Sequence, residues 1–334
     1  MSESRGKGMV DDHSRLLGDI GGTNARWAWQ AAPGAPLQHY REYACDQFDS
    51  VQAVIERYLA DQGLPPPSEA AFGIATPVTG DVVQMTNHPW TFSIQGLKQA
   101  LNLARCLVLN DFAAIASALP FLRSGDMRRL GQGNAATGAP MAVLGPGTGL
   151  GVASLVYTAE GRTMVVDGEG GHVSLAARNA RDFAVVDWLQ KRFGHASAER
   201  AISGPGLVNL YRAVCAIDGQ PAADLTPAQV SAHAAPEDNT VRHRACREAL
   251  QLFSGFLGSV AGDLALTVGA RGGVYVAGGI VPRLGGAFDA YSFRERFEAK
   301  GRFRGYLEGI PTFVITASSP ALIGAANALD VQRR

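Results

Sequence analysis

The sequence lacks the charge imbalance and the cysteine pattern that mark several common classes of protein. Its 334 residues contain 30 Lys and Arg against 30 Asp and Glu, so no net positive charge attracts nucleic acid or an anionic membrane surface. The cysteines lie far apart and form neither a CxxC metal pair nor a disulfide framework; they are Cys45, Cys106, Cys215 and Cys246. These absences favour a cytoplasmic protein that binds a small molecule rather than nucleic acid or a membrane.

A signal peptide and an uninterrupted apolar span are also absent. Residues 1–14 are polar and contain no apolar signal-peptide core, so we expect a disordered lead there. The longest uncharged stretch, residues 130–159, is broken by Pro146 and several glycines, and lipid does not tolerate such irregular backbone. No membrane-spanning segment is predicted.

The two best-known nucleotide motifs are missing as well. Neither GxxxxGK[ST] nor a clean GxGxxG opening a helix occurs, which disfavours the P-loop and Rossmann folds. Three glycine turns stand instead beside apolar runs, at residues 18–23, 145–151 and 278–279. Glycine lets backbone amides converge on an anion, so the three turns together predict a polyphosphate cradle. Each turn alone is more typical of an ordinary hairpin.

The order of apolar runs predicts an α/β protein, long enough for two domains. Residues 15–30 predict a hairpin, residues 49–63 a helix, residues 70–75 and 106–109 strands, and residues 79–81 a hairpin turn. A second hairpin at residues 141–157 opens the other half in the same way, which indicates a duplicated domain. Helices are then expected at 181–193, 197–214 and 241–268, strands at 273–277 and 312–316, and a last helix from Pro320 capped by Ser319.

Asp19 lies inside the first glycine turn, where a carboxylate repels phosphate unless a divalent cation lies between them. Mg²⁺ takes one or two carboxylates besides waters and phosphates, so one Asp suffices. The alternative is an Asp that only accepts hydrogen bonds from turn amides.

Asn110 and Asp111 follow an apolar strand and precede a helical run, at a strand end of the kind where ligand crevices form. Asp111 there can accept a proton from a substrate hydroxyl, and Asn110 can hold a neighbouring hydroxyl. The competing interpretation is a helix N-cap.

A third polar group combines Glu169 and His172 of the loop DGEGGH with Glu199 further along the chain. Carboxylates and an imidazole suit the hydroxyls of a sugar. Zinc is disfavoured because no cysteine or second histidine stands at ligand spacing. For Asn87 and Trp90, in the segment TNHPWTF, a sugar cleft and a core position stay equally open.

Seven segments in this order closely resemble bacterial glucokinases: LLGDIGGTNAR, TNHPWTFS, LNDFAAIA, GPGTGLG, GEGGHV, SAERAISGPGL and VAGGIVPR. The resemblance runs from residue 16 to the final helix. It implies the two-domain α/β fold of actin-like ATPases (ribonuclease H-like), with a cleft between a smaller domain, residues 12–121 plus 312–334, and a larger one, residues 122–311. ARNARDF follows the histidine where related kinases and repressors carry a cysteine-rich zinc motif, so the zinc-free branch and no structural zinc are expected.

The resemblance also implies roles for the candidate residues. Asp111 resembles the catalytic base, within a glucose-binding set of Asn110, Asp111, Glu169, His172 and Glu199. The residues resembling the ATP site, with Asp19 nearest Mg²⁺, are Gly18, Asp19, Ile20, Gly21, Gly22, Thr23, Gly147, Thr148, Gly149, Gly278 and Gly279.

The implied activity is ATP-dependent phosphorylation of glucose at its 6-hydroxyl by a cytoplasmic homodimer. Three alternatives remain: a kinase for fructose, mannose or glucosamine, a non-catalytic sugar sensor, and a chaperone-type ATPase. The residues before the first strand are too few for a DNA-binding helix-turn-helix, which counts against a sugar-sensing repressor. A chaperone-type ATPase has no need of the Glu169, His172 and Glu199 group.

Overall fold

The computed structural model describes residues 13–234 and 240–331, so nearly all of the expected disordered lead lies outside the described residues. The chain divides into two compact α/β units, Met1–Phe121 with Ser319–Arg334, and Leu122–Ser318. The family resemblance implied that the chain passes back from the larger domain to the smaller one at residue 312. Strand β13 (Thr312–Ile315) instead pairs with β12 and β8 of the larger unit, so the chain returns to the smaller unit only at residue 319.

The smaller unit is built on a five-stranded sheet of order β3-β2-β1-β4-β7, in which β1, β4 and β7 run parallel and β2 and β3 are antiparallel additions. Its strands are β1 (Arg15–Ile20), β2 (Asn24–Gln30), β3 (Leu37–Ala44), β4 (Glu69–Ile74) and β7 (Arg105–Asn110), with a separate hairpin of β5 (Val82–Gln84) and β6 (Thr91–Ser93). Its helices are α1 (Val51–Gln62), α2 (Ile94–Ala100), α3 (Asp111–Ala118) and α11 (Pro320–Val331).

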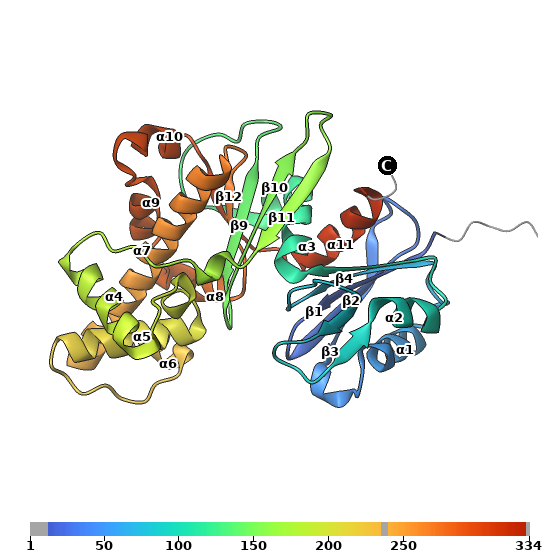
Figure 1. Cartoon of the computed structure of the whole chain (residues 1–334), viewed down its shortest axis with the longest axis horizontal. Helices are drawn as coiled ribbons and strands as arrows, with labels where there is room; N and C mark the ends of the chain where they lie inside the picture. Colours follow the sequence, from blue (N-terminus) through green and yellow to red (C-terminus); the bar gives the residue numbers. More distant parts are fainter. Residues whose placement is uncertain (1–12, 235–239, 332–334) are drawn as a thin grey trace, which may run out of the picture. The chain divides into compact units, whose positions relative to one another are not determined.

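Helices cover both faces of this sheet (Figure 1). Successive strand residues point to opposite faces, so Leu16 packs in the cluster that contains α1 and α2, while Leu17 packs against α11. The predicted first helix is confirmed. Ser50 accepts a hydrogen bond from the Ala53 N–H at its start, and Gly63, with a φ of 61°, ends it in the left-handed conformation that glycine adopts most easily.

The larger unit has a six-stranded sheet of order β11-β10-β9-β12-β13-β8. From β11 to β13 it repeats the order of the smaller sheet, with two antiparallel strands followed by parallel ones, as the duplication hypothesis expects. The strands are β8 (Met127–Arg129), β9 (Met141–Pro146), β10 (Leu150–Tyr157), β11 (Thr163–Gly168), β12 (Val274–Val276) and β13. The helices are α4 (Ala180–Phe193), α5 (Gly204–Ile217), α6 (Pro227–His233), α7 (Val241–Val268), α8 (Ile280–Leu284), α9 (Ala290–Glu298) and α10 (Arg304–Glu308).

Helix α7 forms the centre of the larger unit and begins and ends where the sequence predicted. Within the described part of the chain it is long and apolar enough to cross a membrane, but 78% of its most apolar window is buried in the protein. Helices α4, α5, α6, α9 and α10 surround it (Figure 1). Its apolar length therefore serves the core of this unit.

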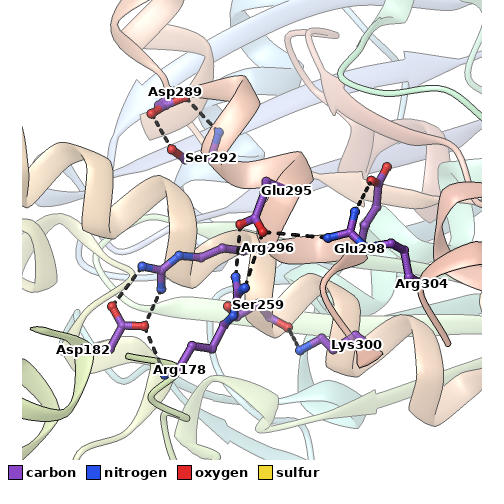
Figure 2. A network of polar contacts seen from close by, with 10 residues as sticks. All are labelled: Arg178, Asp182, Ser259, Asp289, Ser292, Glu295, Arg296, Glu298, Lys300 and Arg304. Carbon is purple, nitrogen blue, oxygen red and sulfur yellow. Dashed lines mark hydrogen bonds and ion pairs between the residues drawn. The ribbon is translucent and has the colours of Figure 1, made fainter. Parts of the chain in front are cut away.

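A network of ion pairs ties α9 to α4 (Figure 2). Arg296 forms two hydrogen bonds of 2.9 Å to Asp182, whose side chain is fully buried. Arg178, which precedes α4, and Glu295 of α9 form a second ion pair with a distance of 3.1 Å. The buried carboxylate of Asp182 is thus neutralised by a bidentate partner, the arrangement that a buried charge requires.

Two predicted elements differ from the structure. The helix expected over residues 197–214 begins at Gly204, because Ser203 accepts a hydrogen bond from the Gly206 N–H and Pro205 favours the first turn. The turn expected at residues 79–81 precedes β5 rather than joining two paired strands. Strand β5 pairs with β6, so their connection spans residues 85–90.

Candidate active site

Three parallel strands of the smaller unit end at the same edge of their sheet. Ile20 is in register with Ile74, and Ile74 with Asn110. The first glycine turn leaves β1 at this edge, and Asp111 begins α3 there. The carboxyl edge of a parallel sheet is where α/β proteins form ligand sites, as the sequence analysis expected for Asp111.

The first glycine turn contains fewer residues than the segment 18–23 that the sequence predicted. Gly18 and Ile20 lie within β1, where Ile20 is buried and a Cβ at Gly18 would lie 2.7 Å from Trp27 and 2.8 Å from Phe72. Gly18 is therefore required by packing. The turn itself consists of Gly21, Gly22 and Thr23, which are the backbone groups that remain for a phosphate.

Asp19 is the one partly exposed residue of β1 and lies beside an arginine. Its side chain is 18% exposed, and its Oδ2 lies 3.5 Å from Nη1 of Arg26. Burial raises the pKa of Asp19 above its ordinary value, and the Arg26 charge opposes that rise without cancelling it. One carboxylate fits Mg²⁺, which is held largely by waters and phosphate oxygens.

Asn110 caps α3, which was the competing interpretation of this residue. Its Oδ1 accepts hydrogen bonds from the Phe112 and Ala113 N–H groups at 2.9 and 3.3 Å. Its Nδ2 donates to the Thr76 carbonyl at 3.4 Å, which links β7 to the loop after β4. Asn110 therefore fixes the start of the helix on which Asp111 stands.

Asp111 is a half-buried carboxylate at the N-terminus of α3. Burial, together with the nearby charge of Asp19, raises the pKa of Asp111 to about 7, although the Phe112 N–H donates to it at 2.9 Å and acts in the opposite direction. A carboxylate with a pKa near neutrality accepts a proton more strongly than an ordinary Asp.

The segment with Asn87 and Trp90 divides into a core residue and a turn contact. Trp90 is 3% exposed and its indole N–H donates to the Phe48 carbonyl at 2.9 Å, so it belongs to the core. Asn87 is exposed, and a Cβ at Gly22 would lie 2.8 Å from the Asn87 Cβ. Asn87 thus lies directly over the first glycine turn.

The other two glycine turns come together in the larger unit. The Gly147 N–H donates to the Gly149 carbonyl at 2.8 Å, which closes the second turn. A Cβ at Gly278, whose φ is 80°, would lie 2.5 Å from the Pro146 carbonyl oxygen at the end of β9. The second and third turns are therefore neighbours, which suits a shared ligand.

The N-terminus of α5 joins them, which the sequence analysis missed. The Gly204 N–H donates to the Gly147 carbonyl at 2.9 Å. Helix α5 was expected to start seven residues earlier, so the positive end of its dipole was expected near residue 197 and away from this turn. The triplet Ser203, Gly204 and Pro205 was the available signal, since serine before glycine and proline is typical of a helix start.

Glu169 and His172 are exposed side chains of one tight loop. They are 65% and 60% exposed, and His172 Nε2 lies 3.9 Å from Glu169 Oε2. The loop packs directly on β10, because a Cβ at Gly171 would collide with the Leu150 carbonyl oxygen. Both side chains are thus exposed to solvent on a loop that is held in place by its packing on β10.

Glu199 lies in a short 3-10 turn, Ala198–Arg200, that is joined to this loop. Ser174 and Ser197 form an antiparallel bridge, and the Ala198 N–H donates to the Val173 carbonyl at 2.9 Å. The loop that carries Glu169 and His172 and the segment that carries Glu199 therefore lie side by side, as a shared sugar site requires.

Among the described residues, no group of three or more His, Cys, Asp and Glu side chains is placed to hold a metal ion. The imidazole of His172 and the carboxylate of Glu169 lie close enough together to bind hydroxyls of the same sugar.

The comparisons with known proteins agree with this geometry. A family model described as Glucokinase matches residues 16–332. A glucokinase of Aromatoleum aromaticum is 52% identical over 324 residues, which are 97% of this chain and 96% of that protein. The solved glucokinase of an Antarctic psychrotroph has a TM-score of 0.87 at 38% identity, covering 95% of this chain and 99% of its own.

A more distant structure shares the fold alone. The ROK family glucokinase from Streptomyces griseus, in complex with glucose and AMPPNP, has a TM-score of 0.60 at 17% identity, over 94% of this chain and 98% of its own. This chain therefore has the actin-like ATPase fold of the sugar kinases. Within that class it belongs to the glucokinase family, and it is an enzyme of the kind that phosphorylates glucose. The predicted fold class, family and enzyme class are confirmed.

Proposed function

We propose that this chain transfers the γ-phosphoryl group of ATP to the 6-hydroxyl of glucose, and that Asp111 accepts the proton of that hydroxyl. The observation that carries the proposal is the position and pKa of Asp111. It stands at the carboxyl edge of the parallel strands, beside the first glycine turn, with a pKa of about 7. A base of this strength is effective at neutral pH.

The remaining roles are assigned by residue chemistry. Glu169, His172 and Glu199 bind sugar hydroxyls, and Asn110 positions Asp111 through its cap of α3. In the larger unit the neighbouring turns 147–149 and 278–279 donate backbone N–H groups to the phosphates of ATP. The turn 21–23 of the smaller unit offers phosphate the same kind of backbone N–H groups. Asp19 would hold Mg²⁺ together with the nucleotide, and the ion would neutralise charge on the triphosphate.

Positioning is the main contribution of the protein. Phosphoryl transfer depends chiefly on alignment and on charge stabilisation, so the fixed backbone of the turns and the anchored carboxylates supply most of the catalysis. By its family likeness we also expect the enzyme to be a cytoplasmic homodimer. Size-exclusion chromatography with light scattering tests the dimer.

A coupled assay of ADP release across a hexose panel tests the activity. Glucose is expected to give the highest kcat/KM, above fructose, mannose and glucosamine. A higher value for another hexose makes that sugar the substrate. Binding of glucose without ADP release makes the chain a sugar sensor and refutes the proposal.

A further inference from the structure

We propose that Glu199 couples the sugar site to the second glycine turn, so that glucose and nucleotide bind cooperatively. This inference rests on the proposed function, since it takes Glu199 as a sugar contact and residues 147–149 as a phosphate contact. What is new is that one carboxylate serves both sites. The contacts that carry it all lie within the larger unit.

The carboxylate of Glu199 is bound to the end of the turn. Its Oε2 accepts a hydrogen bond from the Leu150 N–H at 2.9 Å. A Cβ at residue 149 would collide with the same oxygen, so Gly149 is the residue that lets the carboxylate reach the backbone. A carboxylate has two oxygens, and Oε1 remains to accept a hydrogen bond from a sugar hydroxyl.

Glu199 is anchored by its own backbone. The Ser203 hydroxyl donates to the Glu199 carbonyl at 2.8 Å, and the Ala198 N–H donates to the Val173 carbonyl at 2.9 Å. With the main chain fixed on both sides, the carboxylate reaches Leu150 by its side-chain torsions alone. A sugar that fixes those torsions therefore also fixes the hydrogen bond to Leu150.

The glycine turn is braced through the same group of contacts. The Gly147 N–H donates to the Gly149 carbonyl at 2.8 Å, and the Gly204 N–H donates to the Gly147 carbonyl at 2.9 Å. The Leu150 N–H, which leaves the turn, is the group that Glu199 holds. Ordering of Glu199 by sugar is thus transmitted to the backbone that receives phosphate.

The coupling should be positive, so that glucose and nucleotide each strengthen the binding of the other. A hydrogen bond from an N–H to a charged carboxylate is stronger than one between neutral groups. When glucose orders this carboxylate, the turn is already fixed for the nucleotide, so the nucleotide binds with a smaller loss of entropy. Coupling between two sites is reciprocal, and typical values are about 5- to 150-fold in affinity. We expect about fivefold or more here.

The chain offers a matched pair of variants on the turn. In Gly149→Ala the new methyl group displaces the Glu199 carboxylate, which is the mobile end of a side chain, so the backbone need not shift. In Gly147→Ala the new methyl group has no atom within 4 Å among the described residues. Both variants add the same methyl group to the same turn, and only one of them contacts Glu199.

The test measures glucose affinity by isothermal titration with and without Mg²⁺-AMPPNP. The wild type is expected to bind glucose about fivefold or more tightly with the analogue present. Gly149→Ala is expected to bind glucose about tenfold more weakly without nucleotide and to lose the coupling, because its Glu199 is displaced. Gly147→Ala should keep the glucose affinity of the nucleotide-free wild type.

Two results overturn the inference: no coupling in the wild type, or unchanged glucose affinity and coupling in Gly149→Ala. If Gly149→Ala does not fold, hydrogen exchange of the wild-type protein tests the coupling instead. Glucose alone should slow exchange of amides in residues 147–152, and unchanged exchange refutes the coupling. ADP release by the wild type is measured separately, so the proposed function stands or fails independently of this result.

Discussion

Asp111→Asn should make the ligand-free protein more stable at about pH 8 while removing most of its turnover. Asparagine keeps the shape of the side chain, and its Oδ1 can still accept the hydrogen bond that the Phe112 N–H donates. What it removes is the negative charge. In the folded protein that charge is unfavourable, because burial and the charge of Asp19 raise the pKa of Asp111 from 3.8 to about 7.

The magnitude follows from linkage. The folded protein holds the Asp111 proton more tightly than the unfolded chain, so the free energy of unfolding falls as pH rises from about 4 to about 7. The difference between a pKa of 3.8 and a pKa of about 7 corresponds to about 4 kcal/mol, since one pKa unit is about 1.36 kcal/mol. Since Asp111 is only half-buried, solvent screens part of this, and we expect about 1–3 kcal/mol at about pH 8.

Thermal unfolding of wild type and variant between about pH 5 and pH 8 measures the effect. The melting temperature of Asp111→Asn should exceed that of the wild type at the higher pH by roughly 3–10 °C, and the gap should shrink toward the lower pH. Asp61→Asn, in the same unit, is the control of opposite sign, because hydrogen bonds from Arg57 and Tyr43 lower the pKa of Asp61. An Asp111→Asn protein that is no more stable than wild type at the higher pH, or that turns over normally, refutes the reasoning.

Three further predictions concern pH, metal and stability. In the wild type, kcat/KM should rise with pH through about 7 as Asp111 loses its proton, and Asp19→Asn should move that rise to lower pH in a pH–rate profile, because it removes a negative charge beside Asp111. EDTA should abolish ADP release, and added Mg²⁺ should restore it, while titration shows unchanged glucose affinity. Arg296→Leu should lower the free energy of unfolding by about 3–5 kcal/mol in chemical denaturation by leaving Asp182 buried and unpaired, and Asp182→Asn in the same chain should recover part of that loss.

Much of the fold was predictable because its signals are local. The helix α7 shows helical spacing of apolar residues between Thr240 and Gly269, and both of its boundaries follow from capping chemistry. The start of α5 was missed because the helical spacing continues backward through a 3-10 turn, Ala198–Arg200. The position of β13 was missed for a different reason. Which sheet a short apolar strand joins depends on its pairing partners, and its own residues do not specify them.

The candidate site shows the same division. Residue type and spacing were enough to propose Asp111 and the group of Glu169, His172 and Glu199. The hydrogen bond from Leu150 to Glu199 joins residues 49 positions apart, and no pattern in the sequence predicts it. The raised pKa of Asp111 likewise depends on burial and then on the charge of Asp19, a residue of β1 that comes close only through the sheet register.

The two hairpin turns show how one scaffold serves two different tasks. Each joins antiparallel strands by three residues, Gly21, Gly22 and Thr23 in the smaller unit and Gly147, Thr148 and Gly149 in the larger. The first has the carboxylate of Asp19 beside it, half-buried and only weakly paired with Arg26, so a phosphate there needs a cation. The second has the carboxylate of Glu199, already engaged by a backbone N–H. A substitution of Asp19 should therefore change how phosphate binding depends on Mg²⁺. A substitution of Glu199 should change how nucleotide binding depends on glucose.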